Sequence, residues 1–328
     1  MKNPFVTNGY VSPEYFCDRE KETAKIVSLL TNENNIALIS PRRLGKTDLL
    51  RHCFGQPEIK EHYHTFIIDI YATSSVRDFV NVFGKAVLDE LRPKGKSVWS
   101  TFLNVLASLR SEITFDMNGQ PTWGIGLGAI TNPSATLDEI FSYLNNAGKP
   151  CLIAIDEFQQ ITKYADDPNI EAALRTHIQR CSNAHFVFSG SHRHLMGAMF
   201  TSPTRPFYQS VTLINLPPIS VDKYAEFCLK HFERASKLLD TLVVTELYER
   251  FNGITSYMQK VMNILFSMTG TGEICIPSMI DTAINDLLDF SADTYDALLY
   301  QMPEKQRIVF MAIAAEGKAK AISSGGFV

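Results

Sequence analysis

The stretch NIALISPRRLGKTDLL, residues 35–50, decides the fold, because in it an apolar run enters a polar loop and leaves as a helical pattern. The phosphate-binding pattern GxxxxGK[ST] falls on residues 40–47, with Ser40 in place of the first glycine. Such a loop curls backbone N–H groups around a β-phosphate, while a lysine reaches the β and γ oxygens and a hydroxyl binds Mg²⁺. Gly45, Lys46 and Thr47 supply these parts, so the stretch predicts nucleotide binding.

A second apolar run, at residues 150–155, ends in the acidic pair Asp156 and Glu157. A buried parallel strand delivers acids to the carboxyl edge of its sheet in this way, and the pattern is that of a Walker B motif. A solvated turn could carry the same acids, but their occurrence together with the upstream loop favours ATP binding. Strand alternation is expected to send the two side chains in different directions, and therefore to give them different roles.

Composition and charge limit the classes of protein to consider. The chain has 328 residues, of which 45% are hydrophobic and 20% charged, which fits a soluble protein of two domains. The net charge of -4 gives no global reason to expect nucleic-acid binding. The six cysteines are scattered without a Cys-x-x-Cys pair, so we expect free thiols in the core. No stretch approaches the length of a membrane span and no signal-like apolar region begins the chain, so we expect a cytoplasmic protein.

The order of the predicted elements indicates an α/β domain with a parallel sheet. Five apolar runs are expected to be strands: 36–39, 64–70, 150–155, 185–189 and 211–216. Helical periodicity falls between them, after an N-terminal helix capped by Asp18: 45–53, 79–91, 136–147 and 172–181. The basic segment 191–209 is expected to be a mobile loop.

The region 93–133 is expected to be an insertion in this domain. Residues 98–109 have a helical pattern, and a hairpin is predicted around Asn118-Gly119. The glycines at 124, 126 and 128 do not form GxGxxG, so a flexible or edge strand is favoured over a dinucleotide site.

From Ser220 onward the pattern becomes helical and no further sheet is expected. The predicted helices are 221–234, 242–251, 256–268 and 278–290. We therefore expect an α/β domain over 1–219, a helical lid over 220–295, and the start of a winged helix over 296–328. A winged helix needs more chain than this. Either the sequence is a piece of a longer chain or the segment is an extra helix, and DNA could be bound only through this incomplete unit.

Four segments together resemble the archaeal-type ATPase family, a prokaryotic branch of the AAA+ and STAND P-loop ATPases. They are YFCDRE at 15–20, SPRRLGKTDLL at 40–50, IDEFQ at 155–159 and FSGSHRHLM at 188–196. The chain departs from the family pattern at three points. It has Ser40 for glycine, Gln209-Ser210 where an arginine often stands, and no proline in the lid entry at 252–259.

The resemblance implies an ASCE sheet, in which the strand ending near Ser191 separates the Walker B strand from the P-loop strand. It also implies catalytic roles for three residues: Lys46 would hold the β- and γ-phosphates, Glu157 the attacking water, and Ser191 would act as a polar sensor. Thr47 and Asp156 would hold Mg²⁺. The expected nucleotide-binding residues are Phe16, Ser40, Pro41, Arg42, Arg43, Leu44, Gly45, Lys46, Thr47 and Asp48.

The roles of five arginines stay open at the level of sequence. Arg19-Glu20 would brace the adenine pocket or form a surface ion pair at a helix start. Arg42 and Arg43 would contact phosphates or a neighbouring subunit, or be solvated. Arg175 and Arg180 could reach a neighbour's nucleotide, but a solvated helix face is favoured.

Two function classes follow from these motifs. The first is an ATPase, a hydrolase that couples Mg²⁺-dependent ATP binding and hydrolysis to a conformational switch. The second is an ATP-binding scaffold with little hydrolysis, in a DNA-associated or mobile-element system. A small-molecule kinase is weaker because no acceptor pocket is evident, and the absence of Asn-Lys-x-Asp disfavours a GTPase. The client, any homo-oligomer and any protein partner are left open.

Overall fold

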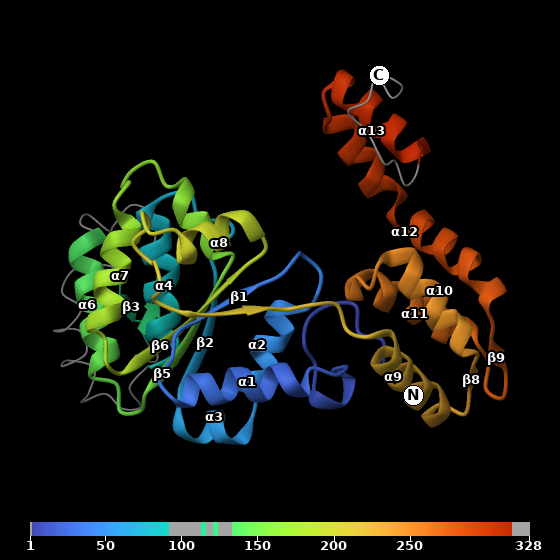
Figure 1. The fold of residues 1–328 in the computed structure, drawn as a ribbon, viewed down its shortest axis with the longest axis horizontal. Helices are drawn as coiled ribbons and strands as arrows, with labels where there is room; N and C mark the ends of the chain where they lie inside the picture. Colours follow the sequence, from blue (N-terminus) through green and yellow to red (C-terminus); the bar gives the residue numbers. More distant parts are fainter. Residues whose placement is uncertain (1, 92–112, 116–120, 124–132, 317–328) are drawn as a thin grey trace.

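A computed structural model describes residues 2–91, 113–115, 121–123 and 133–316 (Figure 1). Its centre is a parallel sheet of five strands in the order β2-β5-β6-β1-β7. The strands are β1 (Ile36–Ile39), β2 (His64–Asp69), β5 (Cys151–Asp156), β6 (Ala184–Gly190) and β7 (Thr212–Asn215). The predicted five-stranded parallel α/β fold is thus confirmed. So is the predicted separation of the Walker B strand β5 from the P-loop strand β1 by β6.

Helices cover both faces of the sheet (Figure 1). On one face lie α1 (Glu20–Thr31), α2 (Lys46–Phe54) and α3 (Pro57–His62). On the other lie α4 (Val76–Glu90), α6 (Pro133–Asn145), α7 (Ile170–Arg180) and α8 (Arg193–Thr201). Alternate residues of β1 enter different cores, with Leu38 under the first group of helices and Ile39 under the second. Every residue of β1, β5 and β6 is therefore buried.

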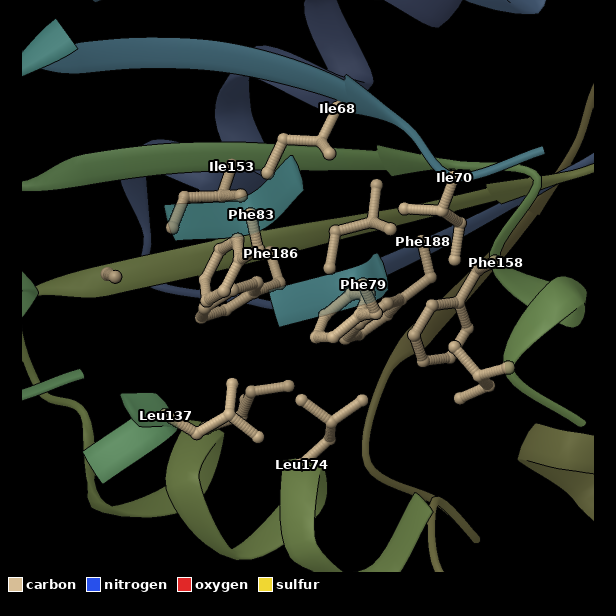
Figure 2. Close-up of a cluster of buried hydrophobic side chains, with 14 of the residues drawn as sticks. Ile68, Ile70, Phe79, Phe83, Leu137, Ile153, Phe158, Leu174, Phe186 and Phe188 are labelled. Carbon is tan, nitrogen blue, oxygen red and sulfur yellow. The ribbon is translucent and has the colours of Figure 1, made fainter. Parts of the chain in front are cut away.

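The larger core is rich in aromatic side chains and runs along one face of the sheet (Figure 2). Phe158 packs with its ring centroid 4.4 Å from that of Phe188, and both side chains are fully buried. Leu137 of α6 and Leu174 of α7 cover the aromatic layer from outside the sheet. Because Phe158 directly follows Glu157, this packing fixes the chain at the carboxyl end of β5.

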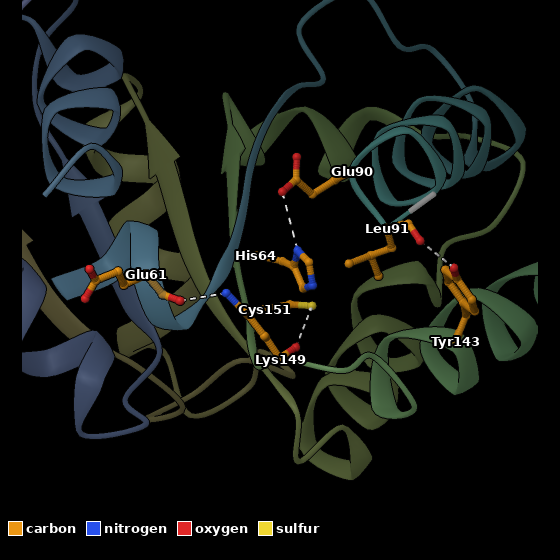
Figure 3. Close-up of polar contacts among 7 residues, drawn as sticks. All are labelled: Glu61, His64, Glu90, Leu91, Tyr143, Lys149 and Cys151. Atoms are coloured by element: carbon orange, nitrogen blue, oxygen red, sulfur yellow. Dashed lines mark hydrogen bonds and ion pairs between the residues drawn. The ribbon is translucent and has the colours of Figure 1, made fainter. Parts of the chain in front are cut away.

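Polar contacts fasten the amino edge of the same sheet (Figure 3). The Lys149 ammonium donates to the Glu61 carbonyl at 2.6 Å, which ties the start of β5 to α3. The Tyr143 hydroxyl donates to the Leu91 carbonyl at 2.8 Å, and burial raises the pKa of this tyrosine to about 12, so it stays a donor. These contacts join α3, α4 and α6 at the amino edge, on the side opposite the carboxyl ends of the strands.

A second core lies among the C-terminal helices. These are α9 (Val221–Arg234), α10 (Thr241–Phe251), α11 (Thr255–Met268), α12 (Ile280–Gln301) and α13 (Glu304–Glu316). Ser220 and Asp240 cap α9 and α10 by accepting from backbone N–H groups. Phe5 of the N-terminal arm, which we define as residues 3–17, is fully buried in this core. The arm contains one 3₁₀ turn, η1 (Pro13–Tyr15).

Several expectations from the sequence are wrong in detail. The segment expected to be a mobile loop contains α8, because Met196, Met199 and Phe200 form a buried stripe at helical spacing. The N-cap of α1 is Arg19, in a left-handed conformation, and not Asp18. The last predicted lid helix continues to Gln301, and α3 was not predicted.

Two short pairings complete the strands. The expectation of no further sheet is wrong, since β8 (Leu238–Leu239) and β9 (Ile274–Cys275) pair within the C-terminal helices. The predicted hairpin is confirmed by the antiparallel strands β3 (Ile113–Phe115) and β4 (Pro121–Trp123). Its turn at 118–119, the helix predicted over 98–109 and the glycines at 124, 126 and 128 lie outside the described residues.

All six cysteines are free and buried, as expected. Among the described helices, none combines the length and apolarity needed to cross a bilayer.

Candidate functional site

A cavity of about 340 Å³ lies at the carboxyl ends of β1 and β5. Three parts of the chain line it: the loop between β1 and α2, the N-terminal arm, and the first turns of α11. The Walker B acids Asp156 and Glu157 also face it. Every predicted nucleotide-binding residue lines this cavity except Ser40 and Pro41, and Ser191 lies one hydrogen bond away through Glu157.

The backbone of the loop has the turn that a phosphate cradle requires. Gly45 has φ +83° and is the N-cap of α2, a conformation that strains any residue with a Cβ. No side chain caps α2, so its first N–H groups remain available to an anion. Ser40 is fully buried and turns its hydroxyl to the Pro41 carbonyl at 3.0 Å. The serine therefore takes the place of the usual glycine without entering the cavity.

Lys46 is a buried cation without an anionic partner among the described residues. Only 6% of it is exposed, and its ammonium donates to the carbonyls of Ser40 at 3.2 Å and Pro41 at 3.4 Å. Burial lowers the pKa of Lys46, against the attraction of Asp156 and Glu157. A buried ammonium that has only carbonyl partners is poorly compensated, and a phosphate would compensate it.

Thr47 and Asp156 join the P-loop to the Walker B strand. The Thr47 hydroxyl donates to Oδ2 of Asp156 at 2.5 Å, across an interval of 109 residues. A hydroxyl and a carboxylate are oxygen ligands of the kind that Mg²⁺ prefers. The described residues contain no group of three or more His, Cys, Asp or Glu able to hold a metal. The pair of oxygen ligands fits an ion that takes few protein ligands and completes its shell with phosphates and water.

Glu157 is held away from Asp156 by its backbone. It has φ +54°, a left-handed conformation, and lies outside the strand. The two acids therefore have different partners because of this turn. Strand alternation, the cause expected from the sequence, is not the reason. Its Oε2 accepts hydrogen bonds from the Ser191 hydroxyl at 2.8 Å and from the Gln159 amide. Gln159 is 3% exposed and was not predicted from the sequence, although it lies within the IDEFQ segment.

Arg42 and Arg43 point in different directions. Arg42 donates from Nε to the Ser191 hydroxyl at 3.3 Å. Arg43, at φ +70°, places its guanidinium 4.8 Å from the Tyr257 ring centroid, and its carbonyl accepts from the Ser256 N–H at 3.2 Å. The loop thus contacts α11 directly.

The N-terminal arm and Arg19, the N-cap of α1, line another side of the cavity. The Phe16 ring stacks on His52 of α2 at 4.4 Å, and the Tyr10 hydroxyl lies 3.0 Å from Nδ1 of the same histidine. Arg19 is 2% exposed and donates to Glu22 and to the Pro217 carbonyl, so it is not the surface ion pair that the sequence left open.

Some residues of the cavity had no signal in the sequence, and some candidates lie elsewhere. The lining residues that were not predicted come mainly from the arm and from α11: Val6, Thr7, Gly9, Tyr10, Val11, Thr255, Ser256 and Gln259. No local motif marks the residues of the arm, whereas Thr255, Ser256 and Gln259 lie in the lid entry at 252–259 that the family resemblance had singled out. Arg175 and Arg180 of α7 do not line the cavity.

Burial raises the pKa of Asp48, which lines the cavity from the first turn of α2.

Two family models match the chain. One, described as an ATPase domain predominantly from Archaea, matches residues 16–261. The other, described as a probable winged helix domain, matches residues 293–328. No curated protein matches.

Solved structures show the same fold at low identity. The Walker-type ATPase of Pyrococcus abyssi has a TM-score of 0.61 at 17% identity, covering 94% of this chain and 81% of that one. The Aeropyrum pernix ORC1 protein in complex with DNA has a TM-score of 0.60 at 13% identity, covering 99% and 79%. The ORC2 protein of the same organism, in its ADPNP-ADP complexes, has a TM-score of 0.57 at 15% identity, covering 87% and 71%.

Proposed function

The chain belongs to the family of ATPase domains found predominantly in Archaea, and from this premise we propose that it binds Mg²⁺·ATP in the cavity and hydrolyses it. The observation that carries the proposal is the hydrogen bond between Thr47 and Asp156, beside the buried Lys46. It brings a phosphate-binding loop and an acidic strand end into one site, as phosphoryl transfer requires.

Five polar residues of the site have roles in this reaction. Lys46 binds the β- and γ-phosphates, and Thr47 and Asp156 hold Mg²⁺, which when bound neutralises charge on the phosphate oxygens. Glu157 orients a water molecule and takes a proton from it as the water oxygen forms a bond to the γ-phosphorus. The bond to the β-phosphate oxygen breaks, leaving ADP and phosphate. Ser191 holds the Glu157 carboxylate and contacts the γ-phosphate.

The helical part of the chain couples nucleotide binding to a conformational change. We assign residues 1–219 to the ATPase domain, 220–295 to a lid and 296–328 to the start of a winged helix. The contact of Arg43 with Ser256 and Tyr257 supports this coupling, because a phosphate that repositions the loop also repositions α11. The match to a winged-helix model supports DNA as a partner of the C-terminal segment.

Two substitutions at the Walker B acids test the proposal. Glu157→Gln should keep ATP binding while single-turnover hydrolysis falls by a factor of roughly 10² to 10⁴, the usual contribution of a positioned base. Asp156→Asn should instead weaken Mg²⁺-dependent binding. Binding is measured by calorimetry and hydrolysis by single turnover, with the exposed Glu58→Gln on α3 as control.

The outcomes separate the two function classes. A Glu157→Gln protein that hydrolyses ATP at the wild-type rate would remove Glu157 from the mechanism. A wild-type chain that binds ATP without turnover would favour the alternative, an ATP-binding scaffold.

A further inference from the structure

We propose that Arg42 is a catalytic residue that each chain supplies to its own ATP, stabilising the charge that develops on the phosphate oxygens during hydrolysis. The inference rests on the proposed ATPase function and goes beyond it, since it assigns transition-state stabilisation to a residue of the P-loop itself. ATPases of this general kind otherwise need such a cation from another element or another subunit.

The position of Arg42 places it beside the reacting groups. It lines the cavity, and its Nε donates to the Ser191 hydroxyl at 3.3 Å. That hydroxyl donates in turn to Glu157 Oε2 at 2.8 Å. Arg42 is therefore two hydrogen bonds from the carboxylate that orients the water. Burial lowers the pKa of Lys46, and the charge of Arg42 contributes to the same shift.

Arg42 has no strong partner to hold it elsewhere. Within the described residues no carboxylate forms an ion pair with it, whereas Arg19, Arg205, Arg234 and Arg250 are each paired with an acid. Its hydrogen bond to Ser191 lies at the long end of the range for N–H donors. Its other contact is the face of Tyr71, which is 55% exposed and lies 5.1 Å from the guanidinium carbon. An exposed cation–π contact is weak, so a phosphate can replace both contacts.

Arg43, the neighbouring arginine, makes a different contact, so the catalytic role is assigned to Arg42 alone. Arg43 lies over the Tyr257 ring of α11. The left-handed backbone at Arg43 turns its side chain toward the helices, while Arg42 stays on the side of Ser191 and Glu157. Of the two arginines, Arg42 alone donates, within the described part of the chain, to Ser191, the residue that donates to Glu157.

A guanidinium at this place can do chemistry that a solvated cation cannot. As water attacks and the bond to the β-phosphate breaks, the electron pair of that bond passes to the oxygen of ADP. The planar fork of arginine donates to two phosphate oxygens at once, and lysine cannot reproduce this geometry. An arginine that acts in this way raises kcat by about 10³ to 10⁵.

Substitution of Arg42 is the first test. Arg42→Gln should lower the single-turnover rate by about 10³ and leave ADP affinity unchanged, while Arg42→Lys should recover only part of the loss. ADP should gain affinity in fluoroaluminate with the wild type, and Arg42→Gln should lose this gain. The control is Arg193→Gln, an exposed arginine at the start of α8 outside the cavity, which should match the wild type.

Mixing two inactive proteins tests whether the arginine acts within its own chain. Equal amounts of Arg42→Gln and Glu157→Gln should show only the sum of their separate activities. Recovery of turnover on mixing would mean that Arg42 serves a neighbouring subunit, and it would overturn the inference. An Arg42→Gln protein that loses ATP affinity at unchanged kcat would also overturn it.

The failure of the inference can be told from the failure of the proposed function. If the wild type hydrolyses ATP and Arg42→Gln does so equally fast, only the inference is wrong. If the wild type binds ATP without turnover, the proposed hydrolysis is wrong and the role of Arg42 is rejected with it.

Discussion

Replacing Lys46 with methionine should have opposite effects on the free protein and on its complex with ATP. The methionine fills the volume of the lysine stem but removes an ammonium that is buried with only two carbonyl partners. We expect the free energy of unfolding of the free protein to rise by about 1 kcal/mol, because an uncompensated buried charge is lost. ATP affinity should fall by about 3 kcal/mol, or roughly 10²-fold, because a buried charge pair with phosphate is truncated.

The sign of the stability effect can be checked against pH. Burial lowers the pKa of Lys46 below its ordinary 10.5, so the folded state disfavours the charged form. The wild type therefore carries the full destabilisation at pH values below the lowered pKa. As pH rises through the lowered pKa toward 10.5, the folded protein loses this proton first and the difference from Lys46→Met should close.

Thermal unfolding with and without ATP·Mg²⁺ measures both effects. The free Lys46→Met protein should unfold about 2 °C above the wild type, and ATP should raise the midpoint of the wild type but not that of Lys46→Met. Lys60→Met, at an exposed lysine on α3, is the control and should respond to ATP like the wild type. Unchanged ATP affinity in Lys46→Met would refute the P-loop assignment. A lower midpoint without ATP would refute the argument from buried charge.

Two further predictions concern packing. At Gly190, a Cβ would overlap Oε1 of Gln159 and lie 2.6 Å from Sδ of Met196. Gly190→Ala should therefore lower the free energy of unfolding by about 1 to 3 kcal/mol. It should also slow single-turnover hydrolysis, because it displaces Gln159, whose amide donates to Glu157. Gly148→Ala, where nothing lies within 4 Å, is its control in denaturant unfolding, and equal stability of the two variants would contradict the overlap. Phe5→Ala should lower the free energy of unfolding by about 3 to 5 kcal/mol, because Phe5 is fully buried among Phe227, Phe232 and Phe266. Val11→Ala, at a 47% exposed position of the same arm, is the control and should leave the midpoint of thermal unfolding nearly unchanged. A Phe5→Ala protein as stable as this control would show that Phe5 does not anchor the arm in the C-terminal core.

The sequence by itself determined the elements whose signals are contiguous. The loop at 40–47, the acids at 156 and 157 and the five strands were predicted because each depends on a local pattern of glycine, charge or apolar residues. The strand order came from the resemblance to the family, since periodicity carries no information on which strands are neighbours. Local pattern failed at α8, where a basic, Pro-containing segment hides a short buried stripe.

Only the tertiary structure decided which side chains share the cavity. The arm reaches it because Phe5 is anchored in the C-terminal core, and α11 reaches it through the contact of Ser256 with Arg43. Gln159 meets Glu157 because of a left-handed residue at the strand end. Arg42 and Arg43 are adjacent and identical in type, and their different contacts follow from one positive φ and two aromatic rings distant in sequence. Such contacts depend on packing between segments far apart in the chain, and no local pattern of residues specifies them.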